Sequence, residues 1–169
     1  FSLLPAALAA PVSRDPAMDP PAVITSPGPG YGDETRKFQG IPGIERTRKG
    51  RLWAVWYAGG DGEGPFNYVV LVTSGDDGRT WSKPRLVVDP AWYVRAYDPC
   101  LWLDPKGRLW LFWAQAVVKW DGRGGVWAMV ANNPEPENPK WSAPRRIADG
   151  VMMNKPTVAK DGRWLLPIG

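Results

Sequence analysis

The sequence contains no histidine and a single cysteine, Cys100. Without histidine the chain cannot form a Ser-His-Asp triad, and it lacks the ligand sets of the usual zinc sites. A single cysteine cannot form an intrachain disulfide. Carboxylate, Arg, Lys and Tyr side chains must therefore carry any chemistry, and we expect neither a metal site nor a cofactor in this chain.

Long apolar runs and dense charge runs are also missing. Apart from a short apolar leader, no stretch approaches the roughly 20 residues that a membrane-spanning helix needs. The formal net charge of +4 comes from scattered Lys and Arg, with no basic run that would mark a nucleic-acid partner. No stretch keeps a 3.6-residue period, so we do not expect long amphipathic helices.

What the sequence does contain is a repeat. Lys-Gly-Arg-Leu-Trp at residues 49–53 returns at 106–110, and Asp-Gly-Arg-Trp-Leu follows at 161–165. Trp-Ser-Lys-Pro-Arg at 81–85 returns as Trp-Ser-Ala-Pro-Arg at 141–145. The copies lie about 55 to 60 residues apart. Such a period indicates stacked structural units, none of which buries its apolar face alone.

Each unit consists of short runs of β-branched, aromatic and aliphatic residues between Gly, Pro, Asn and Asp, which predicts a small antiparallel sheet. Four strands per unit at this period favour an all-β fold, a β-propeller. We expect six blades in the complete propeller and about two and a half in this chain. The predicted strands are 43–47, 51–57, 68–74 and 85–88, then 100–104, 108–114, 126–131 and 145–148.

The chain divides by composition. Residues 1–10 are apolar and end in small residues, as in the tail of a secretory signal peptide, although a disordered apolar leader is an alternative. Residues 11–36 are rich in Pro, Gly, Ser and Asp and predict a linker, in which 22–25 could add an outer strand to a closing blade. We therefore expect a fragment of a secreted or periplasmic protein, with blades at 37–90, 91–148 and, incomplete, 149–169.

The turn at residues 74–81 reads Ser-x-Asp-x-Gly-x-Thr-Trp. An Asp side chain can accept bonds from the N–H groups of its own turn, Gly supplies a positive φ, and Trp packs under the sheet. The pattern resembles the Asp-box, or BNR repeat, of the sialidase superfamily. That resemblance implies a structural role for Asp76, on the face opposite the active site. In the second unit only Trp141 of the box is retained.

The same resemblance implies where a site would lie. Sialidases bind the sugar carboxylate with the Arg of an Arg-Ile-Pro motif, and the matching residues here are Gly40-Ile41-Pro42. Their general acid is an Asp in the loop that corresponds to residues 59–67. Asp61 matches that position best in register, and Glu63 is the nearby alternative.

Further candidates come from positions that match across the repeat. Asp98 and Lys155 precede prolines at the position of Ile41, where core residues are not expected. Most tryptophans recur at matched positions and predict core. Trp92 and Trp120 lie in loops without a counterpart, so they are the candidates for stacking on a sugar ring. The catalytic candidates are Asp61, Glu63 and Asp98, and the substrate-binding candidates are Arg95, Tyr97, Lys155, Trp92 and Trp120.

From the resemblance we expect a secreted exo-glycosidase that hydrolyses a terminal sugar, acidic sugars included, from a glycan or oligosaccharide. Glycoside cleavage requires paired carboxylates, which the loops contain. Two alternatives stay open. One is a non-catalytic carbohydrate-binding propeller, because a fold does not fix a function. The other is a polysaccharide lyase acting on uronic-acid glycans with Tyr or Lys as base.

Overall fold

The computed structural model describes residues 14–117 and 121–169, which form an all-β chain without an α-helix. The predicted signal-peptide remnant at 1–10 and Trp120 lie outside the described residues. The single-turn 3-10 helices are η1 (Pro16–Met18), η2 (Pro29–Tyr31) and η3 (Asp33–Thr35). The strands are β1 (Ala22–Ile24), β2 (Gln39–Arg46), β3 (Leu52–Ala58), β4 (Tyr68–Ser74), β5 (Leu86–Asp89), β6 (Arg95–Leu103), β7 (Leu109–Ala116), β8 (Val126–Ala131), β9 (Arg145–Ala148), β10 (Thr157–Val158) and β11 (Trp164–Leu165).

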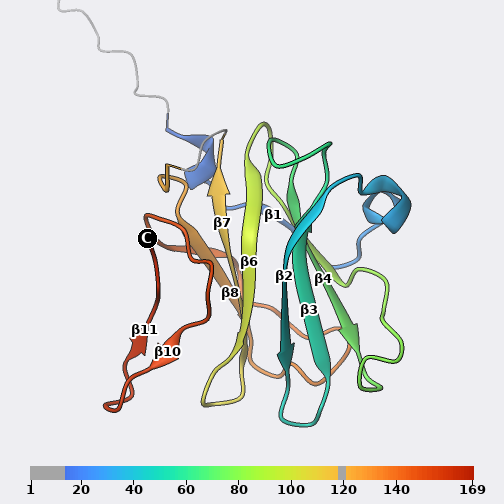
Figure 1. The fold of residues 1–169 in the computed structure, drawn as a ribbon, viewed down its shortest axis with the longest axis vertical. Helices are drawn as coiled ribbons and strands as arrows, with labels where there is room; N and C mark the ends of the chain where they lie inside the picture. The colour runs from blue at the N-terminus through green and yellow to red at the C-terminus, as the bar shows by residue number, and fades with distance from the viewer. Residues whose placement is uncertain (1–13, 118–120) are drawn as a thin grey trace, which may run out of the picture.

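The strands form two antiparallel sheets and a hairpin (Figure 1). The first sheet has the order β1-β5-β4-β3-β2, the second β6-β7-β8-β9, and β10 pairs with β11. The prediction of one four-stranded meander per unit is therefore confirmed for the first two units. The sheets do not close into a ring within the described part of the chain.

The strands β2 and β6, each at one edge of its sheet, begin earlier than the sequence predicts. Both contain a register shift, between Gly40 and Gly43 in β2 and between Tyr97 and Cys100 in β6. The prolines of the two strands lie inside these bulges, where a missing N–H interrupts no ladder bond. Pairing therefore continues beyond the proline, which sequence reasoning took as the start of each strand.

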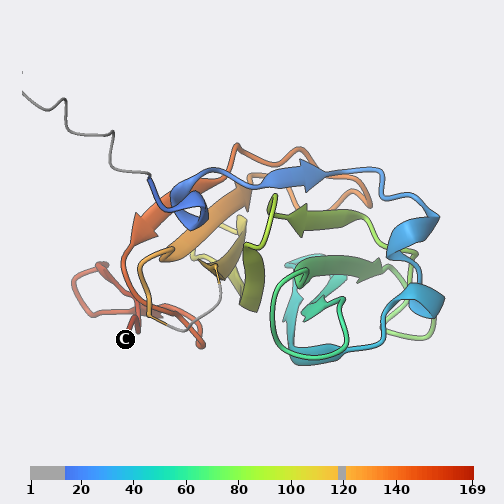
Figure 2. The same ribbon diagram turned by 90° about the horizontal axis from the view of Figure 1, so that it is seen from above.

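Strand β1 corrects the prediction for the linker. Its residues pair antiparallel with β5 in the register Ala22 to Asp89 and Ile24 to Val87. It is thus the outer strand of the first sheet, and not of a closing blade. Figure 2 shows it along the outer edge of that sheet.

The repeated glycines form the same turn in all three hairpins. Gly50, Gly107 and Gly162 have φ values of 98°, 82° and 83°. In each turn, the glycine N–H donates to the carbonyl three residues earlier, on Thr47, Asp104 or Ala159. Only a residue without Cβ adopts this backbone at little cost. The repeat is therefore explained by hairpin geometry.

The Asp-box turn has the hydrogen bonds that its sequence predicts. Asp76 accepts bonds from the Thr80 N–H at 2.9 Å, the Thr80 hydroxyl at 2.6 Å and the Ser74 hydroxyl at 2.8 Å. These donors, the Thr80 hydroxyl first, lower the pKa of Asp76 to about 2. Trp81 is only partly covered: 41% of its surface is exposed, and it lines a hollow together with Ala54 and Val72 of the sheet.

The two sheets pack face to face along β6, which lies against β2, β3 and β4 (Figure 2). Alternate residues of β3 point to opposite faces of the first sheet. Val55 and Tyr57 are buried with Leu101 of β6 in the core between the sheets. Trp141, the repeat counterpart of Trp81, is also packed against this core, edge-on to Trp53 with ring centroids 6.5 Å apart.

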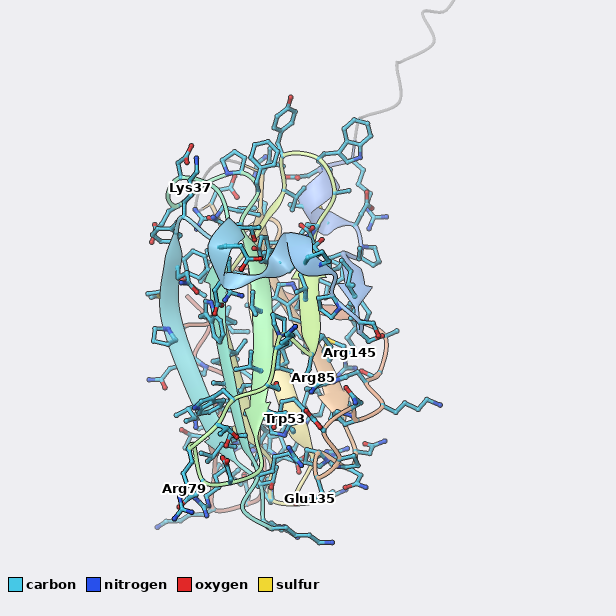
Figure 3. The ribbon with its side chains drawn as sticks, turned by 90° about the vertical axis from the view of Figure 1, so that its right-hand side faces the viewer. Lys37, Trp53, Arg79, Arg85, Glu135 and Arg145 are labelled. Atoms are coloured by element: carbon cyan, nitrogen blue, oxygen red, sulfur yellow. The ribbon has the colours of Figure 1, made fainter. Side chains whose placement is uncertain are left out.

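The turn that replaces the Asp-box in the second unit clamps the first sheet. Glu135 accepts bonds from the Thr47 hydroxyl at 2.8 Å and the Lys49 N–H at 3.2 Å. The Arg51 Nε donates to the Glu135 carbonyl, and Trp53 Nε1 donates to the Pro134 carbonyl at 3.0 Å. Figure 3 shows Glu135 near the lower end of the molecule and Trp53 above it. The clamp therefore joins the two sheets at their hairpin turns.

The clamp leads to a test by mutation of the natural full-length protein. Glu135→Ala should lower the free energy of unfolding by about 1–2 kcal/mol, because the Thr47 hydroxyl is buried and loses its carboxylate acceptor. Urea titration measures the change. The control is Glu137→Ala, which breaks a partly exposed ion pair with Arg85 and should cost less than about 1 kcal/mol. Equal effects of both variants would contradict the clamp.

Candidate functional site

The site lies at the end of the sheets where the β3–β4 loop (59–67) and the β5–β6 loop (90–94) meet; we call this the loop end. The hairpin turns occupy the opposite turn end (Figure 1). The β3–β4 loop is joined to the start of β6, because the Ala96 N–H donates to the Asn67 carbonyl at 2.9 Å. Asn67 is itself buried and its side chain bonds Gly59, Gly62 and Gly64. Hydrogen bonds thus hold the β3–β4 loop in one conformation at this end of the sheets.

Strained backbone marks both β2 and β6 near this end. Ile41 and Asp98 have φ values of 48° and 44°. Each precedes the proline of a bulge, where residues ordinarily adopt extended backbone. Non-glycine residues at positive φ cost about 1–3 kcal/mol and persist where the surrounding structure holds them. Side chains of a strand alternate between the two faces of the sheet, and the bulge interrupts this alternation at Asp98.

Asp98 is the buried carboxyl of the site. It is 1% exposed, and its Oδ2 has no hydrogen-bond partner among the described residues. Burial raises its pKa above the ordinary value; the nearby charge of Arg95 opposes this shift and that of Glu63 adds to it. A carboxylic acid with a raised pKa keeps its proton closer to neutral pH, as a general acid requires.

Glu63 lies beside it and is held by a tyrosine. The Tyr57 hydroxyl donates to Glu63 Oε1 at 2.5 Å. Tyr57 is fully buried, and burial together with the Glu63 bond raises the pKa of its hydroxyl. Tyr57 therefore fixes the carboxylate of Glu63, which is itself exposed to solvent.

Arg95 and Tyr97 form the floor beneath these carboxyls. The Arg95 guanidinium lies over the Tyr97 ring at 4.3 Å and over the Tyr57 ring at 5.7 Å. Both residues are buried, and burial raises the pKa of Tyr97 to about 12. We call Tyr57, Glu63, Arg95, Tyr97 and Asp98 the carboxylate cluster. Four of the predicted candidates, counting Glu63, thus come together, with Tyr57 in addition.

Asp61 is at the same end but outside the cluster. It forms an exposed ion pair with Lys37 at 2.8 Å, which lowers its pKa. Lys37 lies at the opposite end of the molecule from Arg79 of the Asp-box turn (Figure 3). Asp61 and Asp76 are therefore on different faces, as the sequence predicts.

Lys155 is not part of the cluster either. Its Nζ donates to Glu45 Oε2 at 2.9 Å and to the Ile44 carbonyl at 3.2 Å. Glu45 also accepts the Leu103 N–H, so this contact lies towards the turn end of β2 and β6. Lys155 joins the third unit to β2.

The aromatic residues of the loops were only partly predicted. Trp92 is 80% exposed, as expected of a candidate for ring stacking, while Trp120 lies outside the described residues. Sequence reasoning missed Phe66 and Tyr93, which are 61% and 63% exposed. The criterion used for tryptophan, a loop position without a repeat counterpart, would have found both had it been applied to every aromatic residue.

The described residues contain no group of three or more His, Cys, Asp or Glu side chains placed to hold a metal ion. The carboxylate cluster instead brings together a buried carboxyl with a raised pKa, Asp98, and an exposed one that Tyr57 holds, Glu63. Two carboxyls in unlike environments are the usual basis of an acid and base division of labour.

Comparisons with known proteins agree with the fold. The sequence model of the BNR repeat-like domain matches residues 42–169. A crystal structure of a protein of unknown function from Dyadobacter fermentans DSM 18053 is similar, with a TM-score of 0.58 and 18% identity over 79% of this chain. The match covers 47% of that protein, so the chain spans about half of its length. No curated protein matches the chain.

The raised pKa of Asp98 gives a pH-dependent prediction for the natural full-length protein. As the pH rises from the ordinary Asp value of 3.8 through the folded pKa, the free energy of unfolding of Asp98→Asn should increase relative to that of wild type. The reason is that the folded wild type binds this proton more tightly than the unfolded chain, so wild type loses stability when Asp98 ionises. Urea titrations at pH 4 and pH 7 measure the change.

The matched control is Asp61→Asn. The pKa of Asp61 is lowered by Lys37, so its contribution is present above the ordinary value and is lost as pH falls. The variant should therefore show a small change of opposite sign. A stability difference for Asp98→Asn that does not vary with pH would contradict the buried, proton-holding carboxyl.

Proposed function

Because the chain belongs to the BNR repeat-like domain family, we propose that it forms part of a secreted β-propeller that hydrolyses a terminal sugar from a glycan. Asp98 is the general acid and Glu63 the second carboxylate. The observation that carries the proposal is that these two carboxyls share one cluster in unlike environments, one buried with a raised pKa, the other exposed and fixed by Tyr57.

The propeller is supported by the way in which one unit packs on the next. Trp141 packs against the first sheet at Trp53. Trp81, its counterpart in the first unit, borders a hollow that lies between Ala54, Trp56 and Val72 on the other face of the first sheet and residues of the segment 27–36. A preceding blade would cover this hollow as the second sheet covers Trp53. We expect six blades in the complete protein, of which this chain contributes about two and a half.

The division of roles follows from how readily each carboxyl holds a proton. Glycoside hydrolysis needs an acid that protonates the leaving oxygen and a second carboxylate that activates water or attacks the sugar. Asp98 fits the acid because its pKa is raised. Asp61, the better match by register, has a lowered pKa and an exposed cationic partner, so it holds a proton poorly at neutral pH.

Elimination by a lyase would need Tyr or Lys as the base. The tyrosines of the cluster are buried and their pKa values are raised. Lys155 is paired with Glu45 away from the cluster. Hydrolysis is therefore favoured over elimination.

Secretion remains a proposal that rests on the sequence of residues 1–10. No helix among the described residues is long and apolar enough to cross a membrane.

Activity of the natural full-length protein tests the proposal. The probes are 3′-sialyllactose, oligogalacturonates and neutral oligosaccharides, with the products identified by mass spectrometry. We expect release of a saturated terminal sugar from at least one probe. Asp98→Asn and Glu63→Gln should each lower its turnover by about two to four orders of magnitude.

Asp61→Asn serves as the control and should change turnover by no more than a few-fold. A severe loss in this variant alone would return the acid role to Asp61. An unsaturated product would establish a lyase. Binding of a probe without any cleavage would establish a carbohydrate-binding module and overturn the proposed hydrolysis.

A further inference from the structure

Three large aromatic side chains project from the loop end into solvent. Phe66, Trp92 and Tyr93 are 61%, 80% and 63% exposed, and they come from the β3–β4 and β5–β6 loops. The rings of Phe66 and Tyr93 lie 6.1 Å apart between centroids, tilted by 59°. We call these three residues the aromatic rim. Tyr and Trp are enriched at interfaces, so this surface is a candidate for ligand contact.

The backbone holds the rim in a strained conformation. Phe66 and Trp92 have φ values of 71° and 63°, in the left-handed region that aromatic residues rarely adopt. Such strain persists where the surrounding structure enforces it, and it is concentrated at ligand-binding positions. Here the enforcing structure is the buried Asn67, which follows Phe66 and bonds three groups of its own loop.

The rim adjoins the carboxylate cluster in the chain. Glu63 belongs to the same loop as Phe66, and Asp98 lies on the strand that Tyr93 leads into. Asp98 is buried with an oxygen that has no hydrogen-bond partner among the described residues. Carboxyl groups and exposed rings at one end of the sheets suit a sugar, because a sugar offers hydroxyl groups at its edge and C–H groups on its faces.

The charge near the rim argues against other occupants. Lys37 is neutralised by Asp61, and Glu63 adds a negative charge. A membrane surface would call for a cluster of unpaired basic residues, which this end does not offer in the described residues. Three separate rings also make a patch far smaller than the roughly 1,000 Å² that a stable protein interface buries.

We propose that Phe66, Trp92 and Tyr93 form a stacking platform for the sugar units next to the one that occupies the carboxylate cluster. The substrate is then an oligosaccharide chain recognised over several units, and not a simple glycoside. This inference rests on the proposed function for the placement of the terminal sugar, but the platform itself depends only on the rim.

Glycine substitutions provide a clean test. Phe66→Gly and Trp92→Gly remove the rings and relieve the positive φ, so the melting temperature should stay the same or rise while binding is lost. The probe is a printed array of plant, microbial and animal oligosaccharides, applied to the natural full-length protein carrying Asp98→Asn to suppress turnover. The oligosaccharide bound best is then titrated by calorimetry.

We expect Trp92→Gly to weaken binding of that oligosaccharide by about tenfold, whereas its terminal monosaccharide should bind as before. The matched pair Trp92→Phe and Trp92→Leu separates stacking from general apolar burial. Phe should retain most of the affinity, and Leu should lose it.

The outcomes distinguish the platform from the proposed hydrolysis. If wild type cleaves a glycan but the rim variants bind and cleave it unchanged, the platform is overturned and the hydrolysis stands. If no probe is cleaved but binding depends on the rings, the platform stands and the hydrolysis fails. Absence of binding to every oligosaccharide on the array, or binding to lipid vesicles or self-association that Trp92→Gly abolishes, overturns the platform.

Discussion

The site depends on the bulges at Pro42 in β2 and at Pro99 in β6. A proline has no N–H to give to a ladder, and in β2 and β6 the pairing skips residues at the proline. In β6 this skip places Asp98 at a φ of 44° and lets the strand extend back to Arg95. Arg95 of β6 thereby packs over the Tyr97 ring of its own strand and over the Tyr57 ring of the first sheet. The same device in β2 holds Ile41, which contributes no charge.

The two ends of the sheets differ in backbone conformation and in how their carboxylates are paired. At the turn end, the positive φ values fall on glycines such as Gly107, or on Asp77 in the Asp-box turn, and the carboxylates are paired, as Glu135 is with Thr47 and Lys49. At the loop end, glycines such as Gly59 also have positive φ, but so do the aromatic residues Phe66 and Trp92, which rarely adopt it, and the buried carboxyl of Asp98 has a raised pKa. Strained backbone and a buried carboxyl therefore occur together at the loop end, and such features are concentrated at functional sites.

The sequence predicts most of the fold because the repeat fixes it. The ranges of β4, β8 and β9 agree with prediction, since runs of apolar residues between turn signals define them. The early starts of β2 and β6 could not be predicted, because proline and glycine argue against a strand unless a bulge accommodates them. In the site, matching across the repeat singles out Asp98. The pairing of Asp61 with Lys37 could not be read from local patterns, because it depends on how a loop folds over residues distant in the chain.

The most direct measurement is the titration of Asp98 in the natural full-length protein, followed by carbon NMR of labelled aspartate carboxyls and assigned with Asp98→Asn. The buried carboxyl should titrate above the ordinary aspartate value of 3.8, and Asp61, assigned with Asp61→Asn, should titrate below it in the same spectrum. An Asp98 midpoint at or below that of Asp61 would contradict the assignment of Asp98 as the proton-holding carboxyl.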